Sequence, residues 1–138
     1  MKSRLIDTNV IVRFFVEDPE KTHEKFKGVF SFLKKVEMGE IAVELPELVL
    51  FETFYVLTKT YKEPPGEVAQ KLHDLMSFKG ILMRDKPFIS LCLKKLLSKN
   101  IGLLDAYLLA ASEKKGVHEI YSYDTDLSKY GLTLIKID

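Results

Sequence analysis

Residues Ser3–Phe15 read SRLIDTNVIVRFF, and this stretch decides the fold. Its first part, Ser3–Ile6, predicts a short strand that ends at an acid, Asp7. The apolar run from Thr8 to Phe15 then indicates a short helix capped by Thr8 or Asn9. In open α/β sheets, ligands bind beyond the carboxyl ends of the strands. We therefore expect Asp7 to lie in a ligand crevice.

The alternation of strand and helix continues to the end of the chain. Further strands are expected at Ile41–Val43, Ile81–Met83, Glu119–Ser122 and Thr133–Ile137, and further helices at Pro19–Met38, Pro46–Tyr61, Pro65–Phe78, Pro87–Ser98 and Leu103–Lys115, with a turn or brief helix at Asp126–Tyr130. This order predicts an α/β fold, a three-layer α/β/α sandwich with a central, mostly parallel sheet of about five short strands. No repeat or linker divides the pattern, so we expect residues 1–138 to form a single domain.

The composition excludes several classes of protein. Of the 138 residues, 46% are hydrophobic and 30% are charged, which is typical of a globular chain. No apolar run approaches the roughly 18–20 residues that cross a bilayer. The single cysteine, Cys92, cannot close an intrachain disulfide, and Asp7 interrupts the apolar start too early for a signal peptide. We therefore expect a cytoplasmic protein, and a net charge of +1 by itself identifies no partner.

Several acids occupy positions that neither solvation nor packing explains. Glu52 is one of them, because its helical neighbours three and four residues away are Leu48, Val49, Tyr55 and Val56. We therefore expect Glu52 to face the protein rather than water. Asp105 lies on the apolar side of a later helix, and Asp124 and Asp126 follow the fourth strand. Two strand ends and two helix faces can converge on one point, where these acids would meet Asp7.

Each acid also has a simpler interpretation. Asp7 could cap the next helix, Asp105 could be favoured by its helix dipole, and Asp124 could form a side-chain turn. Glu52 could pair with a buried lysine or arginine. If the acids do converge, two of them about 4 Å apart repel by roughly 4 kcal/mol, so either some of them are protonated or a cation lies between them. Oxygen ligands without His or Cys select Mg²⁺ or Mn²⁺, and such an ion suits a phosphate or phosphodiester substrate.

Other kinds of site find little support. The sequence contains no phosphate-binding loop and no dinucleotide fingerprint. His23, His73 and His118 lie far apart without the spacing of zinc ligands, so we interpret them as surface residues. Cys92 lies in an apolar stretch and is interpreted as a small core residue rather than a nucleophile.

The acidic segments, taken in order, resemble the PIN-domain nucleases, and length and spacing resemble the VapC-type toxins of prokaryotic toxin–antitoxin pairs. The segments are Leu5-Ile6-Asp7-Thr8-Asn9, Glu52 within Leu48–Phe54, Leu104-Asp105-Ala106 and Tyr123-Asp124-Thr125-Asp126-Leu127. The resemblance covers essentially the whole chain. It implies that Asp7, Glu52, Asp105 and Asp124 form a catalytic quartet for metal-dependent hydrolysis of RNA.

The resemblance also implies further roles. Asp7, Asp105, Asp124 and the accessory acid Asp126 would be the metal ligands, and Glu52 could be a ligand or position the attacking water. Thr8 and Asn9 would orient Asp7 or hold the substrate. Arg13, on the same helix, is a candidate phosphate contact or simply a solvated cation.

The helix after Pro46 is apolar nearly all round. It could be a central core helix, or it could pack on a second subunit. The resemblance implies a homodimer and an antitoxin partner. Two other interpretations stay open: a PIN-like module that binds RNA or protein without cleavage, and a housekeeping RNA-processing nuclease.

Overall fold

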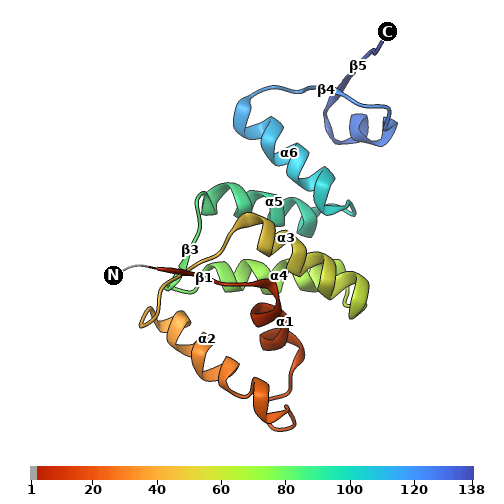
Figure 1. Ribbon diagram of the computed structural model, residues 1–138. Helices are drawn as coiled ribbons and strands as arrows, with labels where there is room; N and C mark the ends of the chain where they lie inside the picture. The colour runs from red at the N-terminus through yellow and green to blue at the C-terminus, as the bar shows by residue number, and fades with distance from the viewer. Residues whose placement is uncertain (1–2) are drawn as a thin grey trace. The chain divides into compact units, whose positions relative to one another are not determined.

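The computed structural model describes residues 3–138, and the chain forms two compact units. Unit 1 is Met1–Lys86 and unit 2 is Pro87–Asp138. In unit 1 the elements are β1 (Arg4–Leu5), α1 (Thr8–Val16), the 3₁₀ turn η1 (Glu24–Phe26), α2 (Gly28–Met38), β2 (Val43–Glu44), α3 (Glu47–Tyr55), the π-helical turn η2 (Val56–Thr60), α4 (Pro65–Met76) and β3 (Ile81–Leu82), as Figure 1 shows from red to green.

The sheet of unit 1 has the order β1-β2-β3, and both pairs of strands are parallel. Arg4 lies opposite Val43, and Val43 lies opposite Ile81. The ladder continues past β1, because the Ile6 amide donates to the Glu44 carbonyl at 3.1 Å. The three carboxyl ends therefore lie at one edge of the sheet, and the chain leaves β1 at this edge through Asp7.

The helices of unit 1 bury one shared apolar core. Its fully buried side chains include Ile11 of α1, Leu33 of α2, Leu50 of α3 and Leu72 of α4. Burial of a Leu or Ile side chain contributes about 1.5–3 kcal/mol, so these side chains stabilise the packing of the helices. Helix α1 packs against α3, and this packing places the elements that carry Asp7 and Glu52.

The segment Pro19–Met38 is not the single helix that we expected. The chain turns after Pro19, and α2 begins only at Gly28. Local polar contacts replace the helix: the Asp18 carboxylate accepts from the Glu20 amide at 2.9 Å, and His23 Nδ1 accepts from the Lys25 amide at 3.1 Å. Such side chain–backbone bonds compete with helical ones. Gly39 ends α2 as expected, in the left-handed conformation with φ 82°.

Unit 2 contains α5 (Lys86–Ser98), which begins at the last residue of unit 1, α6 (Leu103–Lys115), β4 (Glu119–Tyr121), the 3₁₀ turn η3 (Thr125–Tyr130) and β5 (Thr133–Ile135). Strands β4 and β5 pair in parallel. A core cluster of Leu109, Leu127 and Leu132 holds α6, η3 and the chain before β5 together. Gly116 ends α6 in the left-handed conformation, with φ 68°.

The α/β class and the parallel pairing of short strands are confirmed. The five strands found among residues 3–138 have two or three residues each, and each falls within or beside its expected segment. They form two sheets, one of three strands and one of two, rather than one central sheet. Among residues 3–138, no helix is long and apolar enough to cross a membrane.

Candidate metal and phosphodiester site

A cavity of about 240 Å³ lies beyond the carboxyl end of β1. Its lining comes from the start of α1 and the middle of α3 and includes two of the predicted acids: Asp7, Thr8, Asn9, Val12, Arg13, Glu52 and Val56. We call this space the carboxylate cavity. The expectation that the β1 end opens into a crevice is therefore met within unit 1, and Asp7 and Glu52 line the same space.

Asp7 is the N-cap of α1. Its Oδ1 accepts a hydrogen bond from the Thr8 amide at 2.7 Å, and its backbone is extended. The cap is Asp7 itself and not Thr8 or Asn9, so the simpler interpretation of this acid as a cap is also correct. The carboxylate is nevertheless exposed and retains acceptor positions for a second partner. The positive end of α1 stabilises its charge.

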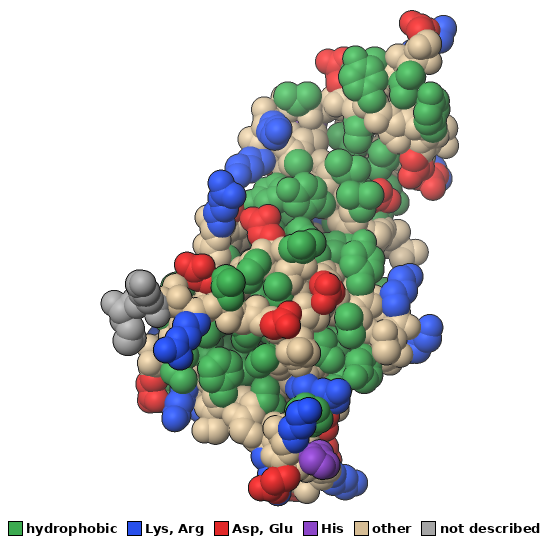
Figure 2. All heavy atoms as spheres, viewed as in Figure 1, with side chains coloured by type: hydrophobic (Ala, Val, Ile, Leu, Met, Phe, Trp, Pro, Cys, Tyr) green, Lys and Arg blue, Asp and Glu red, His purple; other side chains and the backbone are tan. Residues whose placement is uncertain are grey.

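Glu52 does not face the protein interior as we expected, because its side chain is exposed. Two of the four apolar neighbours on which that expectation rested are themselves exposed: Leu48 is 77% exposed and Tyr55 is 44% exposed. Figure 2 shows many hydrophobic side chains on the visible face. Glu52 therefore needs no buried cationic partner, and it lines the carboxylate cavity from α3.

Arg13 is held in place by two contacts. Its guanidinium donates to the Glu17 carboxylate at 2.9 Å and lies 4.3 Å from the centre of the Phe26 ring. Thr22 donates to the other oxygen of Glu17 at 2.9 Å, which fixes that carboxylate in turn. Arg13 still lines the carboxylate cavity. A guanidinium has five donors, so further donors remain for a phosphate.

The three other acids belong to unit 2. Asp105 lies half-buried in the first turn of α6, where a helix dipole favours a negative charge. Asp124 Oδ1 accepts from the Asp126 amide at 2.9 Å and caps η3, which is the side-chain turn considered above. Asp126 forms an ion pair with Lys129 at 3.0 Å. This hydrogen bond and charge raise the pKa of Lys129 above its usual value.

The donors of the carboxylate cavity suit a hard cation. Its lining residues offer carboxylate, hydroxyl and amide oxygens and include neither His nor Cys, a set that prefers Mg²⁺ or Mn²⁺ over zinc. Within residues 3–138, no three or more His, Cys, Asp or Glu side chains are gathered in a metal-binding arrangement. Unit 1 thus supplies two carboxylates that fit such an ion.

A second cavity adjoins α1 and contains residues that sequence reasoning missed. Lys25 and Phe26 of η1 and Phe32 of α2 line it together with Asn9 and Arg13. They were missed because Pro19–Met38 was interpreted as one continuous helix. The signal was present in the sequence: His23 and Gly28 flank a short polar turn that breaks the helical pattern.

Comparison with known proteins gives one family. The sequence matches the PIN domain over residues 4–132, and no curated protein matches it significantly. Among solved structures, the chain is similar to the crystal structure of VapC20 from Mycobacterium tuberculosis, described as a sarcin-ricin loop cleaving toxin. The identity is 17% and the TM-score 0.38, with 98% of this chain and 100% of that chain covered.

Proposed function

The chain belongs to the PIN-domain family, a family of nucleases, and on this premise we propose that it is a divalent-metal-dependent endoribonuclease, the toxin of a toxin–antitoxin pair. The observation that carries the proposal is the pairing of Asp7 with Glu52 across the carboxylate cavity. Two carboxylates from separate elements, with Arg13 beside them, form a site for a cation and an anion together. A phosphodiester bound through a metal ion has this charge pattern.

The residues of unit 1 have distinct roles in this proposal. Asp7 would hold Mg²⁺ or Mn²⁺, because one of its oxygens is not used by the Thr8 amide, and Glu52 would hold the ion or orient the attacking water. Arg13 donates to a nonbridging phosphate oxygen, and Asn9 holds the substrate. The bound ion lowers the pKa of a water and offsets the charge that develops on the phosphate.

We propose that the site is completed by Asp105 and Asp124, with Asp126 as an accessory ligand. Support comes from the family match, which spans both units, and from the motifs that contain these acids. On this proposal residues 1–138 act as one PIN domain. Lys129, which pairs with one oxygen of Asp126, would compete with the ion for this carboxylate.

The partners are proposed on the same basis. The exposed apolar side chains of α3, Leu48 and Tyr55, favour a homodimer contact over a wholly internal helix. An antitoxin protein and a cytoplasmic location follow from the toxin assignment. A housekeeping RNA-processing nuclease, or a PIN-like module that binds RNA or protein without cleavage, is the alternative.

The test is cleavage of a labelled single-stranded RNA by the purified chain with Mg²⁺ or Mn²⁺. We expect endonucleolytic products, no product in excess EDTA, and recovery when the metal is restored. Glu52→Gln and Asp7→Asn should each reduce kcat by about 100-fold or more, because each removes a charge that acts on the metal or the water.

The matched control is Glu47→Gln, which changes an acid of the same helix that lies outside the lining of the carboxylate cavity. We expect it to cleave at the wild-type rate. Asp7→Asn purified in the same way controls for contaminating ribonucleases. RNA binding without cleavage by the wild type would support the non-catalytic module, and equal cleavage by wild type and Asp7→Asn would overturn the proposed site.

A further inference from the structure

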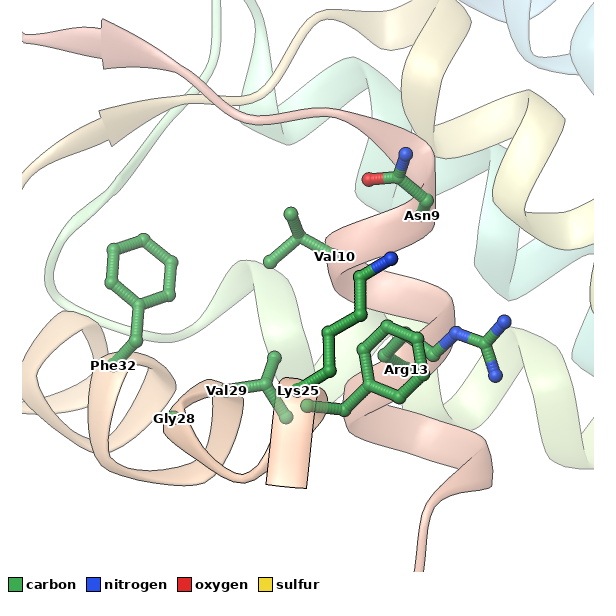
Figure 3. Close-up of a pocket in the computed structure, with 8 residues that line it drawn as sticks. Asn9, Val10, Arg13, Lys25, Gly28, Val29 and Phe32 are labelled. Atoms are coloured by element: carbon green, nitrogen blue, oxygen red, sulfur yellow. The ribbon is translucent and has the colours of Figure 1, made fainter. Parts of the chain in front are cut away.

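A second, larger cavity lies between α1, η1 and α2, with a volume of about 630 Å³. Its lining is Asn9, Val10 and Arg13 of α1, Lys25 and Phe26 of η1, and Gly28, Val29 and Phe32 of α2. Figure 3 shows the α1 residues on one side and Val29 and Phe32 on the other. We call this space the aromatic groove. Its volume falls within the range of about 300–1,000 Å³ that is usual for ligand sites.

The groove combines partly exposed aromatic rings with cations. Phe26 and Phe32 are only half-buried, and the cations Arg13 and Lys25 lie 4.3 Å and 5.6 Å from the centre of the Phe26 ring. No acid is among the lining residues. Aromatic faces beside Lys and Arg are the means by which proteins hold single-stranded nucleic acid, with bases stacked on rings and phosphates on cations.

The groove adjoins the carboxylate cavity, because Asn9 and Arg13 line both. A strand whose phosphodiester lies in the carboxylate cavity can therefore reach the aromatic groove with its neighbouring nucleotide. Arg13 can contact the phosphate from either side. The Asn9 amide offers both a donor and an acceptor to the edge of a base.

We propose that the aromatic groove is a nucleotide subsite that binds the base next to the scissile phosphodiester of single-stranded RNA. The base stacks on Phe26, and Lys25 binds the adjoining phosphate. This proposal rests on the ribonuclease function proposed above and adds a determinant of substrate choice to it. A protein segment is the other possible occupant, but an apolar segment would gain nothing from Arg13 and Lys25.

The experiment measures KM and kcat for an RNA oligonucleotide with one mapped cleavage site, together with binding by fluorescence anisotropy in the Asp7→Asn background. Phe26→Ala should raise both KM and the dissociation constant by about 5- to 150-fold, the usual effect of one lost stacking partner. Lys25→Ala should weaken binding mainly at low salt. Lys27→Ala is the matched control, because Lys27 follows η1 outside the groove and should leave both constants unchanged.

Three further variants separate stacking from folding defects and from apolar docking. Gly28 lines the groove, and a Cβ added there meets nothing within 4 Å, so Gly28→Leu should occupy part of the groove and also raise KM. Phe26→Tyr keeps an aromatic face and should retain binding. Phe26→Leu keeps apolar volume without the aromatic ring and should lose RNA binding. Thermal unfolding of each variant checks that the fold is intact.

An abasic substitution in the RNA identifies the bound nucleotide. Removing one base next to the cleavage site should raise KM for the wild type by the same factor as Phe26→Ala, and it should have no added effect on Phe26→Ala. This loss of additivity is the result that a direct base contact requires. The position at which it occurs gives the side of the scissile bond on which the subsite lies.

The possible failures are distinguishable. Cleavage that is insensitive to Phe26→Ala, Gly28→Leu and every abasic substitution overturns the subsite and leaves the ribonuclease function standing. Retained binding by Phe26→Leu overturns base stacking and favours a protein segment in the groove. A wild-type chain that neither cleaves nor binds RNA overturns both proposals.

Discussion

At the scale of the residue, Asp7 combines a structural contact with a proposed chemical one. One carboxylate oxygen accepts from the Thr8 amide at 2.7 Å and begins α1, and the side chain also lines the carboxylate cavity. The two roles need different properties. Capping needs only a short acceptor, whereas holding a divalent ion needs the negative charge as well.

Substitutions of Asp7 should therefore separate stability from activity. Asn caps helices about as well as Asp, so Asp7→Asn should keep the free energy of unfolding while cleavage is lost. Asp7→Ala should lose cleavage and should also lower the free energy of unfolding, by about 0.5–2 kcal/mol, because the cap is missing. The free energy of unfolding is measured by urea denaturation, monitored by circular dichroism. An Asp7→Asn variant as unstable as Asp7→Ala would show that charge, not capping, stabilises this end of α1.

Sequence reasoning predicted the position of Asp7 at a strand end correctly, but it predicted the orientation of the Glu52 side chain wrongly. The difference has a physical reason. The position of Asp7 follows from local order, since a strand end and a helix start meet there. The exposure of Glu52 depends on what covers α3, and helical periodicity does not contain that information. Leu48 and Tyr55 are apolar and exposed, so an apolar neighbour in the sequence did not mean a buried one.

At the scale of the element, the junction of α2, β2 and β3 depends on one glycine. Gly80 donates to the Val36 carbonyl at 2.8 Å, and its carbonyl accepts from the Val43 amide at 2.8 Å. A Cβ at this position would overlap the Ile41 carbonyl oxygen and lie 2.7 Å from the Val36 carbonyl oxygen. Both neighbours are backbone atoms in hydrogen-bonded segments, so neither can move aside at small cost.

Gly80→Ala should therefore lower the free energy of unfolding by about 1–3 kcal/mol or more, the usual cost of overpacking. Gly66→Ala is the control, since Gly66 lies in the first turn of α4 and an added Cβ meets nothing within 4 Å. That change should stabilise the chain by up to about 1 kcal/mol through helix propensity. The melting temperatures of the two variants are compared by thermal unfolding. Equal melting temperatures would contradict the close packing at Gly80.

Most elements could be predicted because their signals are local. Pro65, Gly39 and Gly116 mark helix ends through fixed backbone preferences, and the observed ends agree at each. The segment Pro19–Met38 could not be predicted by such means. There, hydrogen bonds from Asp18 and His23 side chains outcompete the helical pattern, and periodicity alone does not weigh that competition.

At the scale of the whole molecule, the acids that we propose as ligands are divided between the two compact units. Asp7 and Glu52 belong to unit 1, and Asp105 and Asp124 belong to unit 2. Each set has local contacts of its own, such as the Asp7 cap of α1 and the Asp124 cap of η3. Sharing one ion would couple the two units energetically. That coupling can be measured without reference to cleavage.

The measurement is Mn²⁺ binding by calorimetry to the wild type, Asp7→Asn, Asp105→Asn and the double variant. If both carboxylates bind one ion, their losses in binding free energy should depart from additivity by about 0.5–3 kcal/mol. Asp7→Asn combined with Asp138→Asn is the control, because Asp138 is an exposed acid of unit 2 outside the proposed site. Losses that add within about 0.5 kcal/mol in the first cycle would assign the two acids to separate sites and remove Asp105 from the proposed quartet.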